Sequence, residues 1–265
     1  MANMPQKQHP QKRGPYNKNR KSNIKHNTNH IQDTKVFALG GLNEIGKNMY
    51  CIEHDDEIII IDAGVKFAED GLPGIDYVIP DYSYLKRNQR KIKGLLITHG
   101  HEDHIGGIPF LLQVVDIQFI YASPLACAMI RRKLEEKRLT NATTLIQIDN
   151  LYQIKTKYFN IGFFKTNHSI PESLGIIINT PNGRIVSTGD FKFDLTPVGD
   201  PADFQVMSFL GETGVTLLLS DSTNAEVPNF SISEKQVAYS VQEEFRKTEG
   251  RLIVATFASN VHRVQ

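Results

Sequence analysis

The chain has 265 residues, of which 40% are strictly hydrophobic and 22% are charged, and this composition excludes a protein that is disordered throughout. Its longest apolar runs hold about four to five residues, as at residues 58–61, so we expect neither a membrane span nor a secretory signal. The two cysteines, Cys51 and Cys127, exclude a disulfide framework, and we expect both to be buried apolar residues of a cytoplasmic protein.

The net charge of +1 hides an uneven distribution of charge along the chain. The first 32 residues contain seven lysines and arginines and no acidic residue, which leaves 23 basic against 29 acidic side chains in the rest. Because this stretch is rich in asparagine and poor in aliphatic side chains, we expect a disordered basic tail over residues 1–33. A basic tail on an acidic body indicates a nucleic acid or another acidic surface as its partner. The candidate nucleic-acid-binding residues are Lys12, Arg13, Lys18, Arg20, Lys21 and Lys25.

After the tail, short apolar runs alternate with turns and predict mostly strands. A helix is predicted where Ser123 precedes Pro124, with apolar residues on one face through Lys137, and another where Ser233 and Gln236 form a capping-box pattern. Strands that come in runs of two or three before mixing with helices favour an α/β (α+β) fold, a sheet sandwich flanked by helices, over a regular doubly wound sheet. The predicted strands cover residues 36–39, 49–53, 57–62, 95–98, 119–121, 159–164, 176–179, 185–187, 216–220 and 252–255.

Residues 41–48 nearly match the nucleotide-binding loop G-x-x-x-x-G-K-[S/T], but Asn48 replaces the hydroxyl that would hold magnesium. That loop needs a helix N-terminus behind it, whereas residues 49–53 read as a strand. We therefore predict a hairpin loop whose glycines serve turn geometry.

The segment that carries chemistry follows the strand predicted at residues 95–98. It brings His99, His101, Asp103 and His104 together within six residues. If the strand geometry persists, His99 and His101 point to the same side, while Asp103 and His104 follow a turn and can face a second ion. Four such groups launched from a buried strand favour a metal site over a decorated surface loop, with zinc or manganese as the ion.

Two later residues can complete a metal site. His168 comes directly after the strand predicted at residues 159–164, and Asp190 follows the strand at residues 185–187. Each residue lies just beyond a strand end, where an open site would be built. Neither residue would be persuasive without the histidine segment.

The order and approximate spacing of Asp62, of His99-x-His101-x-Asp103-His104, of His168 and of Asp190 resemble the motifs of the metallo-β-lactamase superfamily. Glyoxalases, lactonases, lactamases and nucleases share these motifs, so the resemblance implies metal-dependent hydrolysis and leaves the substrate open. More specific segments resemble the bacterial ribonuclease J family of the β-CASP branch. They are residues 39–41, 74–81, 189–194 and 220–224 together with Asn260.

The resemblance implies a metallo-β-lactamase αββα sandwich that is truncated at the start of a β-CASP domain. We expect the N-terminal part of the metallo-β-lactamase domain over residues 34–230 and an incomplete β-CASP domain over residues 231–265. The last residues read as the first turn of a helix that does not continue, so we expect a longer parent protein.

The resemblance also implies a role for each metal-site residue. His99, His101 and His168 would hold one zinc ion, Asp103 and His104 a second, and Asp190 would bridge both. The catalytic residues would be Asp103, His104 and Asp190, and Asp62 would orient the histidine loop. Some family members carry calcium, which here would lie near Gly74 and Asp76; a turn with a solvated Asp76 is the equal alternative.

As an activity, the resemblance implies 5′-to-3′ exoribonuclease action with endonuclease cleavage in RNA maturation and decay, including rRNA processing. The implied partners are RNA, a second copy of the full-length protein and other RNA-decay enzymes, with no membrane. The family takes a further metal-ligating histidine from beyond the β-CASP insertion, and His262 is better assigned to a helix surface. We therefore expect weaker binding of the second ion and doubt that this chain alone is active.

Two other functions stay open. One is hydrolysis of a small thioester or lactone by the same metal motif, which the residues 189–194 and the basic tail argue against. The other is a non-catalytic RNA-binding subunit, although a retired site would not need His99, His101, Asp103 and His104 together.

Overall fold

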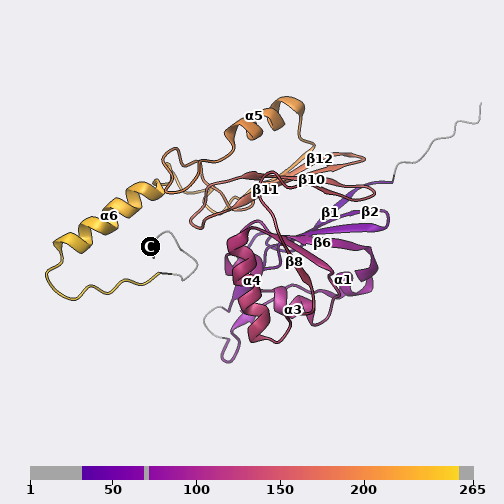
Figure 1. Ribbon diagram of the computed structural model, residues 1–265, viewed down its shortest axis with the longest axis horizontal. Coiled ribbons are helices and arrows are strands. Elements are labelled where there is room, and N and C mark those ends of the chain that lie inside the picture. The colour runs from indigo at the N-terminus through magenta and orange to yellow at the C-terminus, as the bar shows by residue number, and fades with distance from the viewer. Residues whose placement is uncertain (1–31, 69–71, 257–265) are drawn as a thin grey trace, which may run out of the picture. The chain divides into compact units, whose positions relative to one another are not determined.

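The computed structural model describes residues 32–68 and 72–256, and most of its strands form two sheets that pack face to face (Figure 1). In the first sheet, the first three strands are antiparallel neighbours and the remaining contacts are parallel. The spatial order of this sheet is β1 (Lys35–Gly40), β2 (Met49–His54), β3 (Glu57–Ile61), β6 (Ile92–Leu96), β7 (Phe119–Ala122) and β8 (Thr144–Gln147).

The second sheet has five strands, which are antiparallel except for one parallel pair at an edge. Their order is β13 (Leu217–Leu219), β12 (Gly183–Ser187), β11 (Leu174–Thr180), β10 (Asn160–Lys165) and β9 (Ile154–Lys155), with β12 and β13 as the parallel pair. A separate two-stranded ribbon pairs β4 (Lys66–Phe67) with β5 (Tyr77–Val78).

Six α-helices and one 3₁₀-helix lie within the described part of the chain. None of these helices is long and apolar enough to cross a membrane. They are α1 (Ser83–Arg87), η1 (Gln89–Lys91), α2 (Glu102–Ile105), α3 (Ile108–Leu112), α4 (Pro124–Glu136), α5 (Phe204–Thr213) and α6 (Glu234–Lys247).

Both faces of the first sheet are buried, and β3 shows how. Ile59 and Ile61 join the core between the two sheets, together with Ile176 of β11. Ile58 and Ile60 point the other way, into a core that α1, α3 and α4 complete. A strand that alternates between two buried faces can be apolar at every position, which accounts for the uninterrupted isoleucine run.

The second sheet carries a helix on its outer face, where Leu210 of α5 packs with Phe164 and Val186. The layers therefore run helix, sheet, sheet, helix (Figure 1), and the predicted αββα sandwich is confirmed. Cys51 and Cys127 are both buried, as predicted.

Four strands, two from each sheet, have their carboxyl ends at the same end of the sandwich. β3 and β6 run parallel in the first sheet, and β10 and β12 run in one direction in the second because both are antiparallel to β11. The residues that follow these four strands are Asp62, His99, His168 and Asp190. Open α/β sheets bind their ligands at the carboxyl ends of their strands, and this shared end of the sandwich is the corresponding place.

At the opposite end of the strands, the buried carboxylate of Glu57, at the start of β3, connects the two sheets. It accepts hydrogen bonds from Thr156 Oγ1 at 2.5 Å, from Lys157 N at 3.2 Å and from Tyr158 N at 3.1 Å. One side chain of the first sheet thus holds the segment that leads into β10.

The loop at residues 41–48 joins β1 and β2, which are antiparallel, so the hairpin prediction is confirmed. The strand predicted at residues 252–255 is wrong, because this segment forms no ladder with any other described strand. A short apolar run becomes a strand only where a neighbour pairs with it.

The two predicted helix starts are confirmed, but their caps differ from the predicted ones. Ser123 makes no side-chain cap, and the α4 amide of Leu125 donates instead to Glu172 Oε2 at 2.7 Å. At α6, Ser233 Oγ accepts from Lys235 N at 3.2 Å, the second helical amide rather than the third.

Candidate metal centre

Asp62 follows β3 directly and has a left-handed backbone conformation with φ of 58°. Its buried carboxylate accepts hydrogen bonds from Thr98 N and Thr98 Oγ1, both at 2.8 Å. Nδ1 of His104 lies 2.8 Å from the same carboxylate, so it donates there and leaves Nε2 directed at the centre. Asp62 thus fixes both the tautomer and the orientation of His104, as carboxylates behind metal-binding histidines do.

Glycines let the histidine loop pack closely onto its neighbours. A Cβ on Gly64 would lie 1.6 Å from the carbonyl oxygen of Asp103, so only glycine fits there. Gly189 has φ of 57°, and a Cβ on it would lie 2.9 Å from Thr98 Cβ. The loops that carry Asp103 and Asp190 therefore depend on the absence of two side chains.

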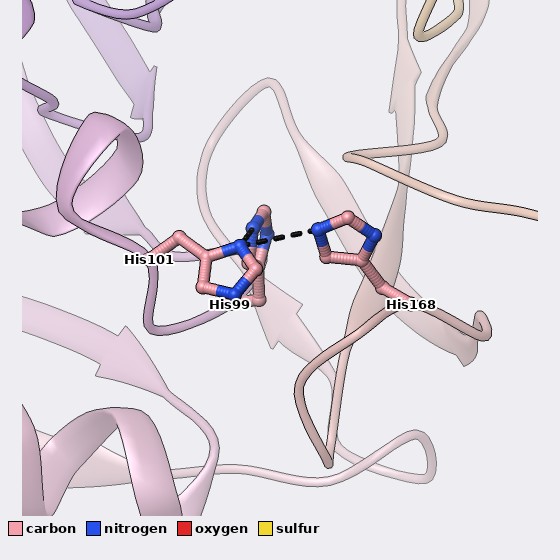
Figure 2. Close-up of side chains that lie close together, drawn as sticks. All are labelled: His99, His101 and His168. Atoms are coloured by element: carbon pink, nitrogen blue, oxygen red, sulfur yellow. Dashed lines mark hydrogen bonds between the residues drawn. The ribbon is translucent and has the colours of Figure 1, made fainter. Parts of the chain in front are cut away.

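Three imidazoles converge beside these loops (Figure 2). Nδ1 of His101 lies 3.0 Å from Nε2 of His99 and 3.1 Å from Nε2 of His168. His99 and His101 come from the loop after β6, and His168 comes from the loop after β10, so the two sheets meet at this cluster.

The His168 loop is tied to the loop that carries Asp190. Asn167 forms an isolated β-bridge with Lys192, whose amide donates to Asn167 O at 2.8 Å. The Asn167 side chain donates to Asp200 O at 2.9 Å and accepts from Ala202 N at 3.1 Å. These bonds hold His168 and Asp190 in one relative position.

Asp190 faces two histidines of different loops. Its Oδ1 lies 3.4 Å from Nε2 of His104, and its Oδ2 lies 3.7 Å from Nε2 of His168. Asp103 Oδ2 lies 3.5 Å from the same His104 nitrogen. The structure therefore brings together all six residues predicted as metal ligands, with Asp190 placed between two sets.

Burial separates the charge states of these histidines. It lowers the pKa of His99 well below the ordinary value, and burial with the nearby His168 lowers the pKa of His101 to about 4. Burial also lowers the pKa of His168. The three-histidine cluster is thus neutral at pH 7 and offers lone pairs, the form that binds a metal ion.

His104 behaves differently. Burial opposes its charged form, but Asp62, Asp103 and Asp190 outweigh burial and raise the pKa of His104 well above its ordinary value. Burial disfavours ionised Asp103 and Asp190 as well, yet His104 lowers the pKa of both carboxyl groups. Three carboxylates around one imidazole create a position that favours a cation.

The donor set fits a divalent metal. The ligand atoms of two overlapping groups lie within 4.8 Å of one another: His99, His101 and His168, and His99, His104 and Asp190. A tetrahedral zinc ion with Zn–N distances of about 2.0–2.1 Å places its ligand nitrogens about 3.3 Å apart, close to the separations here. Nε2 of His101 is buried without a hydrogen-bond partner among the described residues, so polar pairing within the protein does not account for the cluster.

The remaining predicted site residues are not part of this centre. Gly74 and Asp76 lie in an exposed turn before β5, and no group of three ligand side chains in the described ranges includes Asp76. Calcium there stays a prediction. The basic residues of the tail, Lys12 to Lys25, and Asn260 lie outside the described residues.

A cleft of about 720 Å³ opens beside Asp103, His104 and Asp190, between residues 41–46 and residues 218–223. Two of its polar residues were missed by the sequence analysis as site residues. Asn48 lies within hydrogen-bond distance of Asp103, and Asp221 Oδ2 accepts from Phe191 N at 3.4 Å. The sequence analysis treated Asn48 only as part of the near-match to a nucleotide-binding loop, and Asp221 only as part of the family-like segment 220–224.

Relatives with curated functions cover most of this chain. It is 60% identical over 230 residues to ribonuclease J 1 of Streptococcus pyogenes and 47% identical over 231 residues to ribonuclease J of Mycoplasma pneumoniae. Each match covers 87% of this chain and 41% of the relative, so the chain spans about two fifths of their length.

Solved structures share the fold. A crystal structure of a protein of unknown function from Enterococcus faecalis V583 superposes with a TM-score of 0.65 at 15% identity, over 87% of this chain and 62% of that one. Unliganded yeast PDE1 superposes with a TM-score of 0.52 at 15% identity, over 83% and 85% of the two chains. The family model of the metallo-beta-lactamase superfamily matches residues 42–237. With the αββα layers and the histidine–aspartate cluster at the common strand edge, the chain belongs to the metallo-β-lactamase superfamily.

Proposed function

We propose that this chain carries the metal centre of a two-metal ribonuclease that hydrolyses RNA phosphodiester bonds. The observation that carries the proposal is the position of Asp190, whose two carboxylate oxygens face histidines of different loops at 3.4 and 3.7 Å. A carboxylate so placed can serve two ions at once, as phosphodiester hydrolysis with paired metals requires.

In this proposal His99, His101 and His168 would hold one ion, Asp103 and His104 would hold the other, and Asp190 would contribute to both sites. Imidazoles with few carboxylates suit zinc, with manganese as the second choice. A pair of metal ions held by these residues would supply activation of a water molecule near neutral pH and compensation of the charge that develops on the phosphoryl oxygens.

The protein's own residues prepare this site. Asp62 accepts the Nδ1–H of His104 and so directs Nε2 at the centre, and the low pKa of His101 keeps that ring neutral. The cleft of about 720 Å³ beside Asp103 and Asp190 leaves room for a nucleotide chain.

RNA is favoured as the substrate by the identity of 43–60% with ribonucleases J over 230 to 235 residues. We propose 5′-to-3′ exonuclease action with endonuclease cleavage, in the cytoplasm and within a homodimer of a longer protein. In that protein residues 34–230 contribute to the metallo-β-lactamase domain, and α6 begins the β-CASP domain over residues 231–265. RNA contact by the basic tail, calcium at Gly74 and Asp76, and association with other RNA-decay enzymes belong to the same proposal.

The test is decay of a 5′-monophosphorylated, end-labelled RNA by the purified chain with zinc or manganese. Mononucleotide release that disappears in the Asp103→Ala variant supports the proposal and shows that the ligands of this chain suffice. The assay is repeated with the longer protein. If wild-type longer protein binds zinc but leaves RNA intact, the ribonuclease assignment is wrong.

A further inference from the structure

Asn48 ends the glycine-containing loop whose sequence resembles a nucleotide-binding motif, and it directly precedes β2. Its Nδ2 lies 3.2 Å from the carbonyl oxygen of Asp103 and 3.3 Å from Asp103 Oδ2. The same nitrogen lies 3.2 Å from Nε2 of His104. One carboxamide therefore faces two of the proposed ligands of the second ion.

The backbone holds this carboxamide in place. Asn48 N donates to Asp103 O at 3.1 Å, and Gly64 N donates to Asn48 O at 3.0 Å. On the other side, a Cβ on Gly41 would lie 2.6 Å from Asn48 Oδ1, so the glycine at this position makes room for the carboxamide oxygen. Gly41, the first glycine of the near-match to a nucleotide-binding loop, thus makes room for the side chain of Asn48 rather than for a nucleotide phosphate.

The carboxamide nitrogen of Asn48 donates to Asp103 and also lies beside Nε2 of His104, whose Nδ1 is already bound by Asp62. Among the described residues, Asn48 makes no hydrogen bond to His99, His101 or His168. Its contacts therefore favour the second metal position over the three-histidine position.

We propose that Asn48 is a positioning residue of the metal centre: its carboxamide holds the Asp103 carboxylate and thereby sets the affinity of the Asp103–His104–Asp190 position for its metal ion. The inference rests on the two-metal centre proposed above. Hydrogen-bond partners of metal ligands commonly change metal affinity by about 10–100-fold when they are removed.

The experiment compares the wild-type chain with Asn48→Leu, which keeps a similar side-chain volume but removes both donors. The control is Asn179→Leu, because Asn179 also donates to a backbone carbonyl, that of Asn160, but on β11 at the end away from the centre. Zinc is titrated into each metal-free protein against a chromophoric chelator, and thermal unfolding of the metal-free proteins is recorded. An Asp103→Ala variant, alone and combined with Asn48→Leu, identifies which ion responds.

The expected result is that Asn48→Leu weakens the second zinc ion by about 10–100-fold and leaves the first unchanged. The double variant should then bind its remaining ion as Asp103→Ala alone does, because both changes act on one position. If Asn48→Leu binds two ions with wild-type affinities, the inference about Asn48 is wrong and the two-metal centre is unaffected. Equal weakening of both ions with a lower unfolding temperature would also overturn it, since Asn48 would then only stabilise the loop. The zinc titration is repeated with the longer protein, and a single ion bound there would refute the two-metal centre itself.

Discussion

Replacing Gly64 with alanine tests whether close backbone packing sets the metal centre. The added Cβ would lie 1.6 Å from Asp103 O, 2.1 Å from Asp103 C and 2.9 Å from His104 N, all of them backbone atoms. Real Cβ contacts are at least about 3.0 Å, so the loop that carries two proposed ligands must shift by about 1.4 Å. Metal–ligand distances tolerate about 0.2 Å, so the second ion should be lost or bound at least 10-fold more weakly.

Overpacking of this kind costs about 1–3 kcal/mol, which lowers the unfolding temperature by about 2–12 °C in a domain of this size. The assays are thermal unfolding followed by circular dichroism and zinc content after dialysis against a fixed free concentration. Gly211→Ala is the matched control, because a Cβ there meets nothing within 4 Å and an alanine within α5 should leave zinc content unchanged and stability equal or higher. If Gly64→Ala melts with the wild type and retains all its zinc, the argument from close packing is wrong.

Three further outcomes are expected. The metal-free chain should lose stability as pH falls from about 6.5 toward 4. The pKa of His101 is about 4 in the folded chain and about 6.5 in the unfolded chain, so the unfolded chain binds the proton first. In urea titrations the free energy of unfolding of His101→Gln should depend less steeply on pH, and an unchanged dependence would contradict the assignment. Lys192→Met should destabilise the chain by about 3 kcal/mol, because it removes the lysine nitrogen that lies 2.6 Å from the buried Glu234 carboxylate. Adding Glu234→Gln should recover part of this loss, whereas additive losses in chemical denaturation would show that the two residues are not coupled. Deleting residues 1–32 should weaken RNA binding and reduce the slope of log affinity against log salt concentration. The reduction should be at most about 5, since each of the seven basic residues contributes about 0.7 on single-stranded RNA. Equal slopes in filter-binding assays would show that the tail does not contact RNA.

Short-range pattern was enough to predict much of the fold. The isoleucines of β3 and the apolar run before His99 mark strands because each has buried neighbours on both sides, and nine of the ten predicted strand runs overlap strands of the two sheets. The four groups of the histidine segment lie so close in sequence that a metal site could be predicted before the fold was known. His168 and Asp190 were predictable only because each follows a strand.

What escaped prediction depends on contacts between distant residues. Asn48 approaches Asp103 across 55 positions, and Glu172 caps α4 at Leu125 across 47 positions. Neither contact leaves a periodic trace in the sequence. The strands β4, β5 and β9 have two residues each, too few for alternation to be recognised.

The two sheets of the sandwich are fastened at their opposite edges by different chemistry. At one edge, Glu57 ties the sheets with ordinary hydrogen bonds to residues 156–158. At the other, the first sheet contributes His99 and the second sheet contributes His168, so an ion bound by both residues would link the two layers. A ligand that binds only the folded state stabilises it in proportion to the logarithm of its concentration. The metal concentration would therefore change the stability of one end of the sandwich, while the hydrogen bonds of Glu57 hold the other end. The same ion would then serve both hydrolysis and the attachment of one sheet to the other.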